Sequence, residues 1–106
     1  MAKIIGYIRV STIRQDAEHQ RYEILDYANQ RQLHVAEFIE TTTSSRREPK
    51  HRRIDELMNV LQPGDTLIVS ELSRLGRSTS EVIGLVNELI AKEIQFIALK
   101  QGVQLS

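Results

Sequence analysis

The sequence contains no cysteine, no long apolar run and no excess of charge of either sign. Without cysteine the chain forms neither a disulfide nor a thiolate metal site, and a cytoplasmic location is the simplest interpretation. No apolar stretch approaches the roughly 20 residues that span a bilayer, and Arg9 comes too early for a secretory signal, so we expect no membrane function. The equal numbers of basic and acidic residues, 14 each, argue against tight binding of duplex DNA by bulk electrostatics.

The size and the distribution of charge are more informative than the net charge. At 106 residues with 41% hydrophobic residues, the chain is expected to form one domain, residues 1–106. Ten of its basic residues are arginines, and the segment 46–53 holds five basic residues and one acidic residue, a net charge of +4. Because arginine suits bidentate contact with phosphate, this segment suggests an anion site. A solvated loop is the simpler interpretation when the segment is taken alone.

The spacing of apolar residues predicts strands that alternate with helices. The predicted strands cover residues 3–8, 34–39, 66–70 and 95–99. The predicted helices cover residues 13–32, 54–61 and a stretch that starts near 79, where Ser78 and Glu81 match a capping box. Residues 41–49 are predicted as a loop and 100–106 as a short tail. The alternation predicts an α/β fold with a mainly parallel sheet of four to five strands and helices on both faces.

Residues capable of chemistry follow the first and third predicted strands, where function gathers in parallel sheets. Arg9 and Ser11 are two residues apart and so share one side of an extended segment. Arg74 and Arg77 are three apart and point the same way on a helical turn. Three guanidiniums near one hydroxyl suit metal-free phosphoryl transfer, in which serine attacks phosphorus and fixed cations stabilise the developing charge. The alternative is that Ser11 only caps a helix and the arginines are solvated.

Other polar residues near these positions could assist the site. Gln15 and Gln20, in the first predicted helix, could orient a phosphate or its neighbours by neutral hydrogen bonds, and Glu40 and Glu71 could position arginines. None of these carboxylates has the paired acidic partner that a two-metal nuclease uses. The three histidines lack metal-ligand spacing and are predicted to be surface residues without a role, so we expect no metal and no cofactor.

Two segments resemble the signatures of a known family. The string 6–12, Gly-Tyr-Ile-Arg-Val-Ser-Thr, with Gln15 and Gln20 after it, resembles the N-terminal motif of serine site-specific recombinases of the resolvase/invertase family. The block 63–78, which contains Leu-Ser-Arg-Leu-Gly-Arg-Ser at its end, resembles the other signature of that family. The resemblance extends over nearly the whole chain, and it implies the fold of the recombinase catalytic domain.

The resemblance implies a function. Ser11 would be the nucleophile that attacks a DNA phosphodiester, forms a 5′-phosphoserine intermediate and releases a 3′ hydroxyl, after which strands exchange and religate without a metal or nucleotide. Arg9, Arg74 and Arg77 would activate the phosphate. Gln20 would support the site, and Gln15 would contact DNA phosphate.

The sequence departs from the family pattern at three places. Ser73 stands where an aspartate usually precedes the Arg-Leu-Gly-Arg string, so an acid partner for these arginines is either missing or supplied by Glu71. Glu40 stands where an aspartate is common. The arginine of the family's mobile loop fits either Arg46 or Arg47, which are therefore candidate contacts to DNA phosphate.

The resemblance also implies partners: DNA, a homodimer and a synaptic tetramer of the full-length protein. The dimerisation helix and helix-turn-helix domain of the family are absent from this sequence, so we expect weak DNA binding and an activity that requires the missing C-terminal part. One alternative is a non-catalytic dimerisation or interaction module derived from a recombinase. Another is a phosphatase-like α/β enzyme that acts on small phosphoesters.

Overall fold

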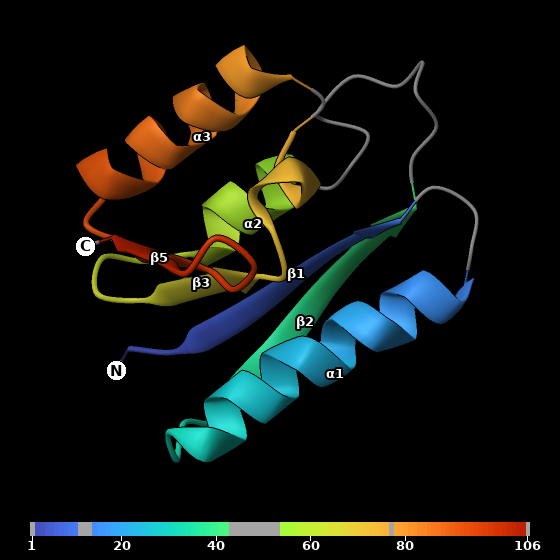
Figure 1. Ribbon diagram of the computed structural model, residues 1–106. Coiled ribbons are helices and arrows are strands. Elements are labelled where there is room, and N and C mark those ends of the chain that lie inside the picture. The colour runs from blue at the N-terminus through green and yellow to red at the C-terminus, as the bar shows by residue number, and fades with distance from the viewer. Residues whose placement is uncertain (1, 11–13, 43–53, 77, 106) are drawn as a thin grey trace.

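A five-stranded sheet forms the centre of the molecule. The computed structural model (Figure 1) describes residues 2–10, 14–42, 54–76 and 78–105. The strands are β1 (Ile4–Val10), β2 (Val35–Thr42), β3 (Thr66–Val69), β4 (Gln95–Ala98) and β5 (Val103–Leu105). They lie in the order β2-β1-β3-β4-β5, with the first four parallel and β5 antiparallel to β4. The predicted α/β fold with a mainly parallel sheet is confirmed.

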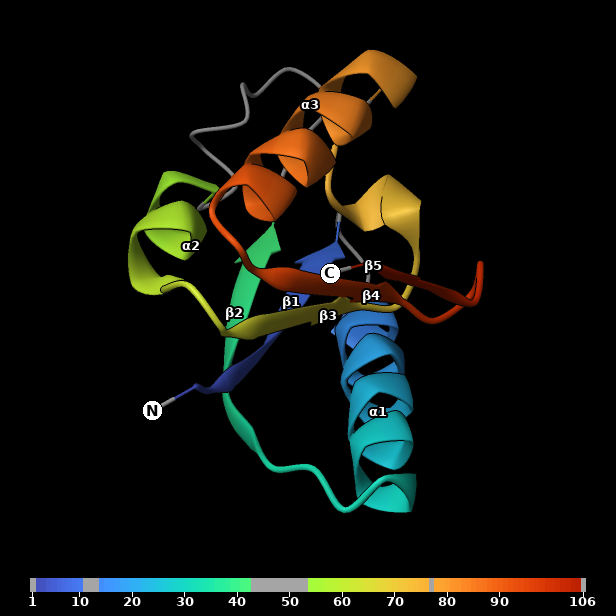
Figure 2. The ribbon, with the colours of Figure 1, turned by 90° about the vertical axis from the view of Figure 1, so that its left-hand side faces the viewer.

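Helices cover both faces of this sheet, as predicted. Figure 2 shows α1 (Arg14–Gln30) on one face, and α2 (Ile54–Val60) and α3 (Thr79–Ala91) on the other. A short 3-10 helix, η2 (Leu72–Arg74), follows β3. The side chain of Ser78 accepts a hydrogen bond from the backbone N–H of Glu81, so the predicted cap does begin α3. In the described ranges, no helix is both long and apolar enough to cross a bilayer.

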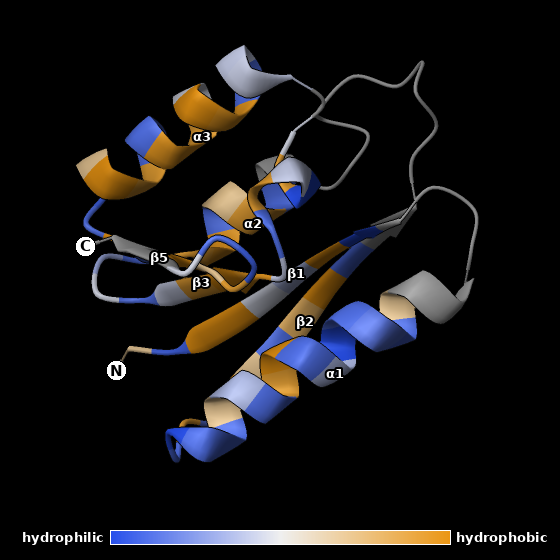
Figure 3. Cartoon of the chain, in the orientation of Figure 1, coloured by the Kyte–Doolittle hydropathy of each residue, from blue (hydrophilic) through white to orange (hydrophobic). Residues whose placement is uncertain are grey.

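The alternation of side chains along β1 and β3 produces two separate cores. Ile5 and Leu67 belong to the larger core, which α2 and α3 cover, whereas Ile8 and Ile68 belong to the smaller core beneath α1. Figure 3 shows the difference in the helices: α3 carries broad apolar bands, and α1 is largely hydrophilic. A sheet buried on both faces holds its strand ends in a fixed relation, and the functional residues depend on that relation.

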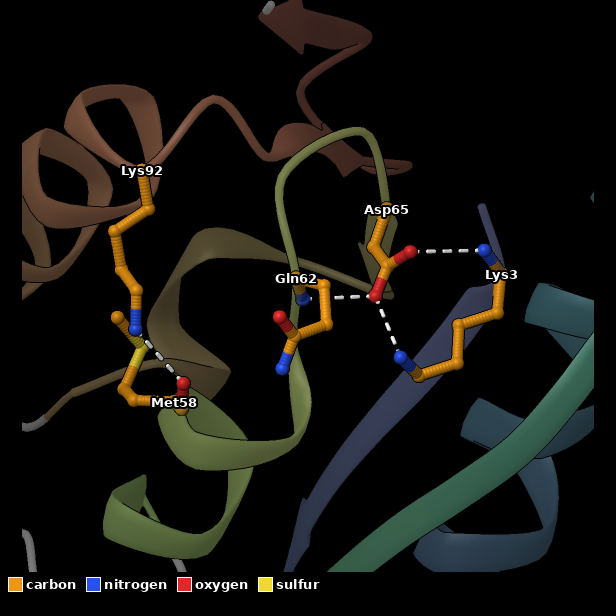
Figure 4. A network of polar contacts seen from close by, with 5 residues as sticks. All are labelled: Lys3, Met58, Gln62, Asp65 and Lys92. Carbon is orange, nitrogen blue, oxygen red and sulfur yellow. Dashed lines mark hydrogen bonds and ion pairs between the residues drawn. The ribbon is translucent and has the colours of Figure 1, made fainter. Parts of the chain in front are cut away.

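A buried carboxylate ties the amino ends of β1 and β3 together. Asp65, 1% exposed, accepts hydrogen bonds from the backbone N–H of Lys3 at 2.9 Å, the Lys3 ammonium at 2.7 Å and the backbone N–H of Gln62 at 2.8 Å (Figure 4). Burial alone would raise the pKa of Asp65, but these hydrogen bonds and the positive charge of Lys3 outweigh burial and hold the pKa below its ordinary value. Asp65 is therefore a structural residue, at the end of the sheet opposite to Arg9.

The structure corrects the sequence predictions at several places. β1 and β2 run on to Val10 and Thr42, beyond the predicted ends at 8 and 39, because their last residues pair with each other. The predicted tail contains β5, since Gly102, at φ 65°, allows the chain to reverse and pair with β4. Of the apolar residues that recur at helical spacing in α1, Ala17, Ile24 and Ala28 are buried, whereas Leu25 is 36% exposed. Most of the predicted loop 41–49 lies outside the described residues.

Candidate active site

The sheet order marks a switch point at the carboxyl ends of β1 and β3. From β1 the chain runs through α1 to β2 on one side, and from β2 it returns through α2, on the opposite face, to β3 on the other side of β1. The connections therefore diverge between β1 and β3, and open α/β sheets bind their ligands at such a point. Arg9, near the end of β1, and η2, just after β3, flank this point.

Arg9 and Arg74 are joined by reciprocal hydrogen bonds between side chain and backbone. The Arg9 guanidinium donates to the carbonyl oxygen of Ser73 (Nη2, 2.7 Å) and to that of Arg74 (Nε, 3.1 Å). In return, Nη1 of Arg74 donates to the carbonyl oxygen of Arg9 at 3.3 Å. Two positively charged residues are thus linked where β1 ends and η2 lies. Like charges repel, and an anion bound near both would relieve the repulsion.

Gln20, which belongs to α1, hydrogen-bonds to the backbone of Arg9 from the face of the sheet that α1 covers. Its side chain is 1% exposed, its amide Nε2 donates to the carbonyl oxygen of Arg9 at 3.1 Å, and its Oε1 accepts from the backbone N–H of Arg9 at 3.4 Å. One buried side chain, that of Gln20, thus bonds both the backbone N–H and the carbonyl oxygen of Arg9. Because Ser11 is only two residues further along the chain, Gln20 holds the backbone that leads to it.

The described residues therefore bring together three of the predicted site residues, Arg9, Gln20 and Arg74. The positions of Ser11 and Arg77 lie outside the described residues, as do those of Arg46 and Arg47. Gln15 belongs to the first turn of α1, but its side chain is not among those described.

The sequence and the fold both match proteins of known kind. The family model for the resolvase N-terminal domain matches residues 4–106. The chain belongs to this family. Among curated relatives, it is 38% identical over 103 residues to the protein uvp1 of Escherichia coli, covering 97% of the chain and 51% of that relative. It is 37% identical over 103 residues to the serine recombinase gin of Escherichia phage Mu, covering 97% of the chain and 50% of gin.

Solved structures show the same relationship to the resolvase domain. The N-terminal catalytic domain of TP901-1 integrase superposes with a TM-score of 0.76 at 25% identity, covering 96% of this chain and 80% of that one. The C-terminal catalytic domain of IS1535 TnpA, an IS607-like serine recombinase, gives a TM-score of 0.69 at 26% identity, covering 90% and 69%. The chain spans about half the length of the curated relatives it matches. Family membership associates the domain with site-specific recombination in general.

The two carboxylates singled out from the sequence occupy different surroundings in the resolvase domain. Glu40 forms an ion pair with Arg21 of α1 at 2.8 Å. Glu71, at the start of η2, accepts a hydrogen bond from the Ser73 hydroxyl and lies 3.6 Å from the ammonium of Lys100. The Ser73 hydrogen bond is the main reason that the pKa of Glu71 lies below its ordinary value; partial burial opposes this, and the charges of Arg74 and Lys100 add to it.

A pocket of about 330 Å³ lies next to Arg74, between α1 and the segment that follows β3. Its lining residues are His19, Gln20, Glu23, Ser70, Glu71, Arg74, Leu99 and Lys100. The hydroxyl of Ser70 is buried there and has no hydrogen-bond partner among the described residues. His19 is exposed and lies 3.6 Å from Glu23, which agrees with the surface position predicted for it. Ser70 and Lys100 had no signal in the sequence, because their proximity arises only from the pairing of β3 with β4.

Proposed function

We propose that this resolvase domain cleaves and rejoins DNA through Ser11. The observation that carries the proposal is the Arg9, Gln20 and Arg74 cluster: the Arg74 guanidinium and the buried Gln20 amide both bond the backbone of Arg9, two residues before a serine. The Arg9 guanidinium in turn donates to the backbone of η2. A fixed pair of guanidiniums suits the charge that develops on the non-bridging oxygens of a phosphodiester under attack. Arg77 is proposed to add a third positive charge, and Gln15, Arg46 and Arg47 to contact DNA phosphate.

The proposed step exchanges one phosphoester for another. The Oγ of Ser11 forms a bond to phosphorus as the bond from phosphorus to the 3′ oxygen breaks. One proton leaves the serine hydroxyl and one reaches the 3′ oxygen, so the products are a 5′-phosphoserine ester and a free 3′ hydroxyl. Because an ester replaces an ester, the reverse attack reseals the strand without another source of energy. No metal or nucleotide enters this scheme.

Strand exchange between two duplexes breaks four strands, and each break forms one phosphoserine ester. Four serines, and so four subunits, are therefore needed. We therefore propose that the domain acts within a homodimer that pairs into a synaptic tetramer on DNA. The relatives are about twice as long as this chain, and the corresponding additional length of a full protein is proposed to read the crossover site and to assist assembly.

The test is a trapping experiment on a substrate with a nick near the scissile phosphate, which prevents resealing. The whole chain is fused to a sequence-specific DNA-binding domain, and Ser11→Ala is compared with the unmodified chain. Ser80→Ala, which changes an exposed serine of α3, is the matched control. We expect a denaturation-resistant protein–DNA adduct with Ser11 and with the control variant, and none with Ser11→Ala.

Three other results would reject the proposal, and each would favour a different alternative. Equal adduct with and without Ser11 would assign the nucleophile elsewhere. Site-bound protein without adduct would favour the non-catalytic interaction module. Hydrolysis of a small phosphoester at a rate indifferent to DNA would favour a phosphatase-like enzyme.

A further inference from the structure

The helix that carries Arg74 is held from two sides. From β1, the Arg9 guanidinium donates to the carbonyl oxygens of η2. From the turn that follows β4, the side-chain oxygen of Gln101 accepts from the backbone N–H of Leu72 at 3.1 Å, and the ammonium of Lys100 approaches Glu71. A helix of three residues has little stability of its own, so these outside contacts determine where η2 lies.

Glu71 is the point at which these contacts meet. Its carboxylate accepts from the Ser73 hydroxyl within η2 and pairs with Lys100 outside it, and its carbonyl oxygen accepts from the backbone N–H of Arg74 at 3.1 Å. The Glu71 side chain is 26% exposed and that of Lys100 is 71% exposed, so the ion pair itself contributes little. The contact to Ser73 and the negative charge beside Arg74 are the more important effects.

The charge of Glu71 matters because of the two arginines. Arg9 and Arg74 are brought together by hydrogen bonds to each other's backbone, and their positive charges favour separation. The Glu71 carboxylate interacts favourably with the charge of Arg74 and so offsets part of this repulsion. A neutral amide at position 71 would preserve a hydrogen-bond acceptor for Ser73 and Lys100 but would remove that offset.

We propose, building on the function proposed above, that Glu71 is a positioning residue that orients the Arg74 guanidinium toward Arg9 at the carboxyl end of β1. It acts through Ser73 and through the turn between β4 and β5, and it does not touch the DNA. The site in this resolvase domain thus uses an acid two residues before Ser73.

The first arm of the test measures the arginines directly in the 106-residue chain. Nitrogen-15 NMR follows the exchange of each arginine Nε proton with water, before and after Glu71→Gln. We expect the Nε proton of Arg9, which donates to η2, to exchange at least tenfold faster in the variant. The Arg21 guanidinium, paired with Glu40, is the internal control and should not change.

The second arm measures the rate constant of single-turnover cleavage with the fusion protein described above. We expect Glu71→Gln to lower this rate constant tenfold or more without changing the affinity for DNA or the melting temperature by more than a few degrees. Adding Ser73→Asp to Glu71→Gln returns a carboxylate to η2 and should restore the rate to within threefold. Glu88→Gln, on the exposed face of α3, should behave as the unmodified protein.

The two proposals fail differently. If the unmodified fusion forms no Ser11-dependent adduct, the proposed function is wrong, and the NMR arm still decides whether Glu71 orders the arginines. If the adduct forms but Glu71→Gln changes cleavage less than twofold, the positioning role is wrong and the nucleophile stands. A loss of rate that follows only a loss of folded protein, or one that Ser73→Asp does not repair, also overturns the positioning role.

Discussion

Replacing Gln20 with alanine separates the part that this side chain plays in folding from the part that it plays at the site. The substitution removes the hydrogen bonds at 3.1 Å and 3.4 Å to the backbone of Arg9. At roughly 0.5–1.5 kcal/mol for each bond, we expect a loss of about 2 kcal/mol in the free energy of unfolding. The carbonyl of Arg9 keeps its bond from Arg74, and the neighbouring pocket admits water, so the loss should not be much larger.

Urea denaturation of Gln20→Ala, followed by circular dichroism, gives the stability, and the matched control is Gln30→Ala on the same helix. Gln30 is exposed and bonds only to Asp26 among the described residues, at 3.1 Å, so we expect the control to change stability by less than about 0.5 kcal/mol. Cleavage by the fusion protein should fall about 100-fold, because a shift of about 1 Å in a reacting group costs that much. A loss of stability equal to that of the control, or cleavage within threefold of the unmodified protein, would refute the reasoning.

Three further predictions concern the fold and the arginine pair. Asp65→Ala should lose about 3 kcal/mol at pH 7; because the pKa of the folded state is lowered, the loss should be full above about pH 4 and fade as the pH falls further, as urea titrations at pH 7 and pH 3 would show. Gly6→Ala should cost about 2 kcal/mol in thermal unfolding, since its Cβ would lie 2.5 Å from the Phe38 ring, and Phe38→Leu should recover part of it. Arg74→Lys should leave the melting temperature nearly unchanged but reduce cleavage at least 100-fold, because an ammonium lacks the planar fork of donors; equal cleavage would count against the arginine pair.

The sequence was sufficient for the order of strands and helices because each buried strand has an apolar run of its own. It was insufficient at the ends of elements, where pairing between distant segments decides. β1 reaches Val10 only because Thr42 lies beside it, and β5 exists only because β4 offers an open edge. Thr42 carries no apolar signal, and the alternation of Val103, Gln104 and Leu105 is too short to identify a strand.

The site was predictable to a similar extent. Arg9 and Arg74 were expected to converge at the ends of the first and third predicted strands, and the structure joins them by hydrogen bonds. The direction of their hydrogen bonds, each to the backbone of the other, could not be inferred from residue types. The contact of Glu71 with Lys100 was equally inaccessible, because it depends on a turn that is 29 residues from η2 in sequence, as the bond between Leu72 and Gln101 records.

The buried carboxylate of Asp65 has a practical consequence. It lies before β3 and the arginine pair lies beyond the other end of that strand, so at about 3.3 Å for each of the four residues the two are separated by at least about 13 Å. Substitutions separated by more than about 7–10 Å without shared partners usually combine additively. Substitutions at the amino end of the sheet can therefore raise thermal stability without altering the site. In a protein stabilised in this way, a destabilising substitution at the carboxyl end still leaves the protein folded, so a loss of cleavage can be assigned to the site and not to unfolding.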